Sequence, residues 1–190
     1  TLIDAGNKPG GVCLHRGCIP SKTLLHLAHL INETKEAKTW GIDFGEPKID
    51  LDAVRNKKDQ IIDKMATGLA QLCKQRKVKF VSGKGKFKDS QTIEINDKLY
   101  PFDHCILATG SRPIQPFQND SNLIDSTGAL DLESIPEKLL VIGGGYIGLE
   151  MGSVYAALGS QVTVVEMMGG LLTGVDRDLV RPYNIESKTN

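Results

Sequence analysis

The chain has 190 residues, of which 23 are basic and 23 acidic, so its formal net charge at pH 7 is zero. A neutral chain sets up no long-range field that would attract nucleic acid or an anionic membrane surface. Hydrophobic residues make up 40% of the sequence, but no apolar run approaches the roughly 20 residues of a transmembrane helix. We therefore expect a soluble globular protein of one domain or two small ones. No secretory signal is visible, although a chain that begins at Thr1 rather than Met leaves this point open.

The first half of the chain is predicted to contain strands and two long helices. Thr1–Asp4 is typical of a buried strand that ends on an acid. Apolar residues at helical spacing predict a helix from residue 13 to about 38, distorted near Pro20, and another over 51–77. Short strands are expected at 79–82, 85–88, 92–95 and 105–108.

The second half is predicted to be a strand–helix–strand unit after a linker that contains proline, from Arg112 to about Pro136. The strands are Leu139–Ile142 and Gln161–Glu166, and the helix between them is Tyr146–Leu158. This order predicts a parallel strand pair with a right-handed crossover. The tail after Gly174 has no clear pattern, and the final residues are typical of a truncated or disordered end.

A glycine-rich turn joins the first strand of this unit to its helix. Gly143-Gly144-Gly145-Tyr146-Ile147-Gly148 matches G-x-G-x-x-G, and Glu166 ends the next strand, which completes the dinucleotide-binding fingerprint. Gly143 permits the tight turn, Gly145 lets a pyrophosphate approach the backbone, and Gly148 allows the helix to pack closely. Glu166 would bind a ribose 2′-hydroxyl and repel a 2′-phosphate, which favours NAD over NADP. The alternative is a purely structural unit with chance glycines.

Cys13 and Cys18 form the second motif, with four residues between them after a Gly-Gly turn. A helix start stabilises a thiolate, so this spacing predicts a redox-active disulfide. A structural disulfide is the plainer alternative, and a metal site is another, although His15, His26, His29 and His104 form no pair with ligand spacing. Cys73 and Cys105 are expected to be inert buried thiols.

The run from Gly10 to Lys22 resembles the disulfide motif of the FAD-dependent pyridine nucleotide-disulfide oxidoreductases. The other motifs follow in the order of that family, so the resemblance covers nearly the whole chain. It implies an α/β fold with two Rossmann-like dinucleotide-binding domains, both incomplete in this chain. The FAD-binding domain would span residues 1–115 and the NAD-binding domain residues 116–190.

The same resemblance implies roles for individual residues. Cys18 would lie beside the flavin as a charge-transfer thiolate, and Cys13 would exchange with substrate. Lys22 and Glu150 would form an ion pair near the flavin N5. Asp4 would bind the adenosine ribose of FAD, and the other implied FAD contacts are Gly11, Lys22, Gly85, Thr109 and Gly110. The family's acid–base histidine belongs to a partner subunit's interface domain, and its His-x-x-x-x-Glu pattern is absent here, while His15 is a weak alternative base.

Cys18-Ile19-Pro20-Ser21-Lys22 most resembles the branch of the family that oxidises protein-bound dihydrolipoamide with NAD⁺ as acceptor. This implies a homodimer that serves lipoyl domains of 2-oxo acid dehydrogenase complexes or the glycine cleavage system. It further implies a cytoplasmic or mitochondrial-matrix location, with no nucleic acid, membrane or metal partner. The chain by itself is expected to be inactive. The rivals are another family member, such as mercuric reductase or a soluble flavin reductase, and a non-catalytic dinucleotide-binding module.

Overall fold

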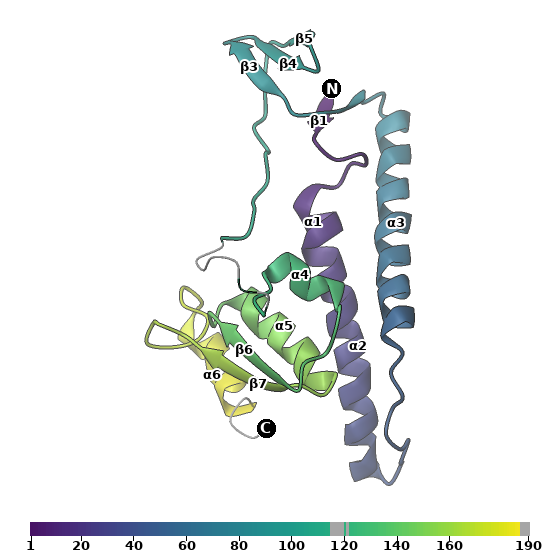
Figure 1. Cartoon of the computed structure of the whole chain (residues 1–190), viewed down its shortest axis with the longest axis vertical. Coiled ribbons are helices and arrows are strands. Elements are labelled where there is room, and N and C mark those ends of the chain that lie inside the picture. Colours follow the sequence, from purple (N-terminus) through teal and green to yellow (C-terminus); the bar gives the residue numbers. More distant parts are fainter. Residues whose placement is uncertain (115–119, 121, 187–190) are drawn as a thin grey trace. The chain divides into compact units, whose positions relative to one another are not determined.

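Figure 1 shows the chain as a computed structural model in which residues 1–114, 120 and 122–186 are described. Both helices and parallel strand pairs are present, so the predicted α/β class is confirmed. By packing, the chain divides into two compact units. Unit 1 comprises Thr1–Pro20 and Asp52–Pro116, and unit 2 comprises Ser21–Leu51 and Phe117–Asn190. The division at 1–115 and 116–190 concerns nucleotide binding and stays a prediction.

Unit 1 begins with a parallel strand pair. Strand β1 (Leu2–Asp4) pairs with β2 (Phe80–Ser82), with Ile3 opposite Val81. The side chain of Ile3 is half-buried, so the expected buried strand is only partly covered. Helix α1 (Gly11–Arg16) follows β1, and the long helix α3 (Leu51–Gln75) leads to β2. Helix α3 confirms the prediction for residues 51–77 to within two residues at its end.

The helix predicted from residue 13 to about 38 is interrupted at Gly17. Helix α1 ends at Arg16, α2 (Cys18–Glu36) begins two residues later, and the 3₁₀ turn η1 (Ala37–Trp40) closes the segment. A Cβ at Gly17 would lie 3.1 Å from the carbonyl oxygen of Val12, so the break suits glycine. Pro20 lies in the first turn of α2, where its missing N–H is not needed, and it therefore causes no distortion.

Three short strands form an antiparallel sheet in unit 1, in the order β3 (Lys86–Asp89), β4 (Thr92–Ile95) and β5 (Lys98–Pro101). Strand β5 was not predicted. Its hairpin with β4 turns at Asn96 and Asp97, whose φ values of 48° and 62° are those of a two-residue hairpin loop. The Asn-Asp pair between two short apolar runs was the signal for this strand.

Residues 105–108 do not form the predicted strand. They pair with no other strand in the part of the chain that the structure describes, and Ile106 and Leu107 are 92% and 70% exposed. Apolar residues form a strand only where a neighbour satisfies the backbone N–H and C=O groups. The sequence of this stretch suits a strand, but no pairing strand is available to it here.

Unit 2 contains the predicted strand–helix–strand unit. Strands β6 (Lys138–Ile142) and β7 (Gln161–Val165) are parallel and in register, and α5 (Tyr146–Ala157) covers one face of the pair (Figure 1). Helix α2 runs alongside α5 within the same unit. The side chain of Tyr155 is 1% exposed and its hydroxyl donates to the carbonyl of Ala129 at 3.1 Å, which joins α5 to the preceding helix, α4 (Ser126–Asp131).

Two helices of unit 2 were not predicted, namely α4 (Ser126–Asp131) and α6 (Arg177–Glu186). The Asp125 side chain caps α4 by accepting from the backbone N–H groups of Thr127 and Gly128, each at 2.9 Å. The acid at Asp125, a residue type favoured at the N-cap of a helix, was the signal for this helix. Part of the predicted linker, at 115–119 and 121, and the end of the chain at 187–190 lie outside the described residues.

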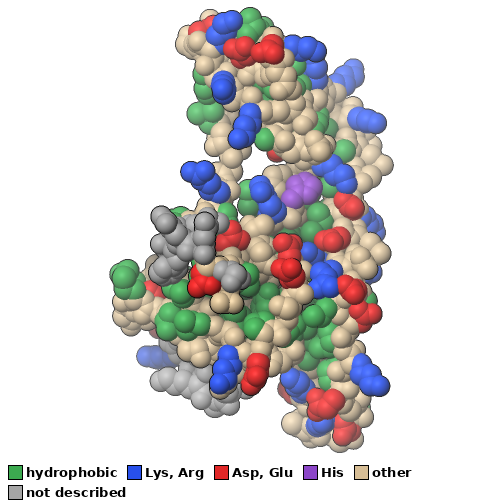
Figure 2. Space-filling view, in the orientation of Figure 1, with side chains coloured by type: hydrophobic (Ala, Val, Ile, Leu, Met, Phe, Trp, Pro, Cys, Tyr) green, Lys and Arg blue, Asp and Glu red, His purple; other side chains and the backbone are tan. Residues whose placement is uncertain are grey.

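The surface carries charges of both signs. Figure 2 shows acidic and basic side chains scattered over the face in view, which agrees with the zero net charge of the sequence. Within the described residues, no helix is both long enough and apolar enough to span a membrane.

Candidate functional site

The two cysteines of the motif lie on different helices of unit 1. Cys13 lies within α1, and Cys18 is the first residue of α2 because the helix breaks at Gly17. Both are exposed free thiols in this structure, which is the reduced form of the predicted pair. Cys18 therefore lies at the end of α2 that presents unpaired backbone N–H groups.

A hydrogen bond joins the two sulfurs. It raises the pKa of the Cys13 thiol above its ordinary value, and partial burial and the charge of Cys18 act in the same direction. The backbone N–H of Cys18 donates to the Cys13 sulfur and opposes them, but the net shift is upward. A hydrogen bond that raises the pKa is one that Cys13 donates, since it stabilises the protonated form.

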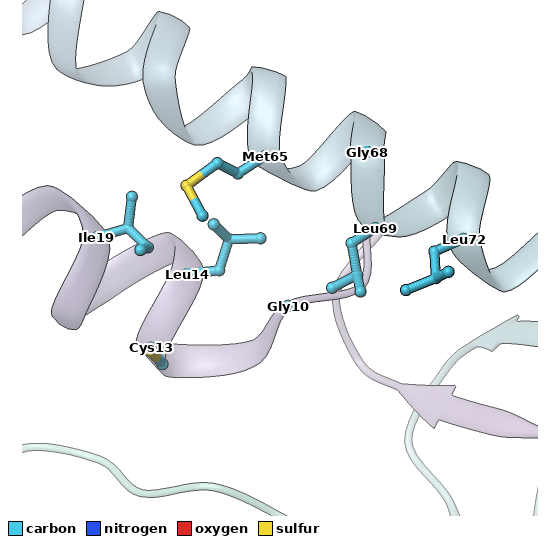
Figure 3. Close-up of a pocket in the computed structure, with 8 residues that line it drawn as sticks. All are labelled: Gly10, Cys13, Leu14, Ile19, Met65, Gly68, Leu69 and Leu72. Atoms are coloured by element: carbon cyan, nitrogen blue, oxygen red, sulfur yellow. The ribbon is translucent and has the colours of Figure 1, made fainter.

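Beside Cys13, unit 1 has an apolar pocket of about 390 Å³. Figure 3 shows Met65 extending from α3 toward Leu14 and Ile19, with Cys13 at one end of the pocket. The other lining residues are Gly10, Gly68, Leu69 and Leu72. Carbon atoms dominate these walls, so the pocket suits an aliphatic group better than a charged one.

Cys73, Cys105 and His15 are not part of the Cys13–Cys18 pair. Cys73 is half-buried and Cys105 is exposed, so the expectation that Cys105 is buried is wrong. Its strand does not form, and the thiol consequently stays in solvent. The Nε2 atom of His15 lies 3.2 Å from the carbonyl oxygen of Pro9, a contact that links α1 to the loop before it.

The residues expected at the flavin lie in unit 1, apart from Lys22 and Glu150. Asp4 ends β1, and its carboxylate accepts from the backbone N–H of Gly6 at 2.7 Å. Gly11 starts α1 with φ of 59°, and a Cβ there would meet nothing within 4 Å. The open space at Gly11 and the acid at the strand end are compatible with a bound dinucleotide.

The other three expected flavin contacts lie on loops and at a strand start. Gly85 directly precedes β3, and a Cβ there would lie 3.0 Å from a methyl carbon of Ile93. Gly110 has φ of 75°, and a Cβ there would lie 3.4 Å from Val12 of α1. Thr109 is exposed beside it, on the segment that does not form a strand. Their contact with a flavin stays a prediction.

Lys22 and Glu150 form the expected ion pair within unit 2. The ammonium of Lys22, on α2, contacts Oε1 of Glu150, on α5. Ser21, which was not predicted, donates its hydroxyl to Oε2 of the same carboxylate. Burial of Glu150 would raise its pKa, but the hydrogen bonds from Lys22 and Ser21 and the charge of Lys22 together hold that pKa below its usual range.

This depressed pKa gives a stability test. A carboxyl group whose pKa is lower in the folded state stabilises the fold above its unfolded pKa, near 4.5, and loses that contribution as the pH falls through the folded value. We expect the thermal unfolding midpoint to fall over this acid range in the parent protein. In the Glu150→Gln variant the decline should be shallower, and identical pH profiles for the two proteins would contradict the assignment.

The glycine loop has the geometry that the fingerprint requires. Gly143 has φ of 108°, which L residues with a side chain rarely adopt. A Cβ at Gly148 would lie 2.2 Å from the carbonyl oxygen of Gly143, so only glycine fits there. A Cβ at Gly145 would meet nothing within 4 Å, and the backbone at this position is open to a ligand. A diphosphate could therefore reach the N-terminus of α5.

Glu166 follows β7, and its side chain is hydrogen-bonded to the glycine loop. Its carboxylate accepts from the backbone N–H of Gly144 at 2.7 Å and from that of Met168 at 2.8 Å. These two hydrogen bonds, with that of Met168 the stronger influence, lower the pKa of Glu166. The acid is therefore ionised at neutral pH beside the open backbone of the glycine loop.

No group of three or more His, Cys, Asp or Glu side chains within the described residues is arranged to hold a metal ion.

Comparison with known proteins places the whole chain in one family. Residues 1–188 match the family described as pyridine nucleotide-disulphide oxidoreductase. The chain is 48% identical to a dihydrolipoyl dehydrogenase of Vibrio cholerae, an alignment that covers 100% of the chain and 42% of the relative. It is 50% identical to the dihydrolipoyl dehydrogenase of Haemophilus influenzae, over 96% of the chain and 40% of the relative. The chain thus spans about two fifths of the length of these relatives.

A solved structure has the same fold. It is the Cu(II) complex of RclA, an HOCl-induced flavoprotein disulfide reductase from Escherichia coli, which matches with a TM-score of 0.80 at 25% sequence identity. The match covers 99% of this chain and 41% of that chain.

Proposed function

This chain belongs to the pyridine nucleotide-disulphide oxidoreductase family, and we propose that it supplies the disulfide and nucleotide-binding parts of a dihydrolipoyl dehydrogenase. The observation that carries the proposal is the hydrogen-bonded Cys13–Cys18 pair, with Cys18 at the start of α2. High identity to two dihydrolipoyl dehydrogenases supports the choice within the family.

The residues present fit both nucleotides. The open backbone at Gly145, the close packing at Gly148 and the carboxylate of Glu166 would hold NAD. Asp4, Gly11, Gly85, Thr109 and Gly110, together with Lys22, would hold FAD in its own Rossmann-like domain. FAD, when bound, supplies the chemistry that carries an electron pair from the cysteines to NAD⁺ as hydride.

The cysteine pair would oxidise a dithiol by two exchange steps. A substrate thiolate attacks the sulfur of Cys13 in the disulfide, the S–S bond breaks, and the electron pair leaves on Cys18. The second substrate thiol then attacks the substrate sulfur bound to Cys13 and releases the Cys13 thiolate. The substrate leaves as a cyclic disulfide after losing two electrons and two protons. The cysteine pair has gained the two electrons, and the protons pass to the reduced cysteines or to solvent. The helix start at Cys18 lowers the cost of the first step because it stabilises the leaving thiolate.

The whole protein would work as a homodimer on lipoyl domains of 2-oxo acid dehydrogenase complexes. Its acid–base histidine would come from the partner subunit, as the family resemblance implies. A cytoplasmic or mitochondrial-matrix location follows from the same proposal.

Glu166 gives a test of the nucleotide. Glu166→Ala removes the acceptor for the ribose hydroxyl and the charge that repels a 2′-phosphate, so NAD affinity should fall about tenfold and the preference over NADP should narrow. Calorimetric titration of both nucleotides measures the effect. Glu137→Ala, at an exposed acid of the same unit, is the matched control and should bind as the parent does. An unchanged preference in Glu166→Ala would contradict the role.

The proposal as a whole is tested on the purified full-length protein. We expect a yellow protein with bound flavin that forms NADH from dihydrolipoamide and NAD⁺. Oxidised glutathione with NADPH, or mercuric ion with NADPH, should give no comparable turnover. A colourless protein would point to a non-catalytic module, and turnover only with mercuric ion would point to another member of the family.

A further inference from the structure

The Glu150 carboxylate is held by two contacts that differ in burial. Ser21 is 8% exposed, whereas the side chain of Lys22 is 63% exposed and that of Glu150 is 25% exposed. The Ser21 hydroxyl uses its one proton to donate to Oε2, which leaves Oε1 for the ammonium of Lys22. The two oxygens of the carboxylate therefore have separate partners, one buried and one facing solvent.

The buried contact is the one that can fix the carboxylate. The Lys22 ammonium lies at the exposed end of a long flexible side chain, and holding it in one place costs rotamer freedom. Ser21 is short, lies in the first turn of α2 and belongs to the same unit as Glu150. Its hydrogen bond to a charged acceptor is of the strong kind and orients the carboxylate plane.

We propose that Ser21 is a positioning residue that sets the orientation of Glu150, and through it the place of the Lys22 ammonium. This inference rests on the proposed function, in which Lys22 and Glu150 lie at the flavin. Without the hydroxyl, Oε2 would lose its donor, and the carboxylate would rotate toward water or take up a proton. Lys22 would then lose its fixed partner while keeping its charge.

The charge balance at Glu150 is simple enough for this effect to be measured. Lys22, on α2, is the charged group that acts on the carboxylate, and within the described residues no ionisable group of α4, β6 or β7 does so. A change in the titration of Glu150 on loss of the Ser21 hydroxyl therefore reports the loss of that donor.

The test compares Ser21→Ala, Ser21→Thr and Ser153→Ala in the full-length protein. Ser153 is the matched control, because it lies on α5 like Glu150 but donates to the backbone carbonyl of Leu149 at 2.8 Å. The first measurement is the titration of the Glu150 side-chain carboxyl by ¹³C NMR, with the signal assigned by its loss in Glu150→Gln. The second is the rate at which NADH reduces the bound flavin.

We expect Ser21→Ala to raise the pKa of Glu150 and to slow flavin reduction about tenfold. Ser21→Thr, which keeps the hydroxyl, should restore both values, and Ser153→Ala should leave both at the parent level. An unchanged Glu150 titration in Ser21→Ala would overturn the inference. Alanine fits the space that serine occupies, so we expect Ser21→Ala to fold. If it does not fold, Ser21→Gly, which also lacks the hydroxyl, replaces it in both measurements. If the parent protein binds no flavin, the proposed function fails, while the NMR titration still decides the role of Ser21.

Discussion

We expect Cys18→Ser to lose dithiol oxidation by at least about a thousandfold, the scale on which a covalent catalytic unit fails when one member is removed. A serine oxygen forms no disulfide, so the pair cannot accept electrons from the substrate. Steady-state NADH formation from dihydrolipoamide, measured on the flavin-loaded full-length protein, gives the rate. Because Cys18 is exposed, the free energy of unfolding should change by only about 0.5 kcal/mol.

The other cysteines separate a redox role from general thiol chemistry. Cys13→Ser should lose turnover to the same extent, because both sulfurs are needed for one disulfide. Cys105→Ser is the matched control, since Cys105 is also an exposed thiol but lies outside the motif. Turnover at parent rates in Cys18→Ser would contradict the redox assignment.

The second large effect is expected from Gly148→Ala. Glycine to alanine in a helix normally stabilises a protein by about 1 kcal/mol. At this position the added Cβ would lie 2.2 Å from the Gly143 carbonyl oxygen and 3.0 Å from a methyl carbon of Val141. Helix α5 must move away from β6, so we expect unfolding to become easier by about 3 kcal/mol and NAD binding to be lost. Urea unfolding and nucleotide titration measure the two effects.

Two further glycines serve as controls for this result. Gly68→Ala, in α3, would place its Cβ with nothing within 4 Å and should stabilise the protein by about 1 kcal/mol. Gly145→Ala is also free of contacts and has an ordinary φ of −77°, so the fold should persist while NAD binding weakens. A Gly148→Ala variant as stable as the parent would show that the close packing at this turn is not required.

Local patterns in the sequence predicted much of unit 2. The glycine turn, the helix after it and both parallel strands form where expected, because each rests on residues within a short window. Glu166 lies beside the loop for the same reason. The pairing of Lys22 with Glu150 was predicted from the family resemblance and not from their spacing in the sequence.

Features that depend on distant partners were missed. The stretch at 105–108 has a strand-like composition, but pairing decides whether a strand forms, and the sequence does not display a pairing strand. Ser21 escaped notice because its acceptor is 129 residues away. The break at Gly17 was missed for a different reason, since Pro20 looked like the stronger helix breaker but is harmless in a first turn.

Glu166 shows why the nucleotide preference of such a protein resists gradual change. The acid that would read the ribose also accepts two backbone N–H groups, from Gly144 and Met168. A lineage that drifted toward the phosphorylated nucleotide would need new acceptors for both amides in the same step, or its loop would loosen. A substitution of Glu166 would therefore remove two hydrogen bonds of the loop together with the acceptor proposed for the ribose.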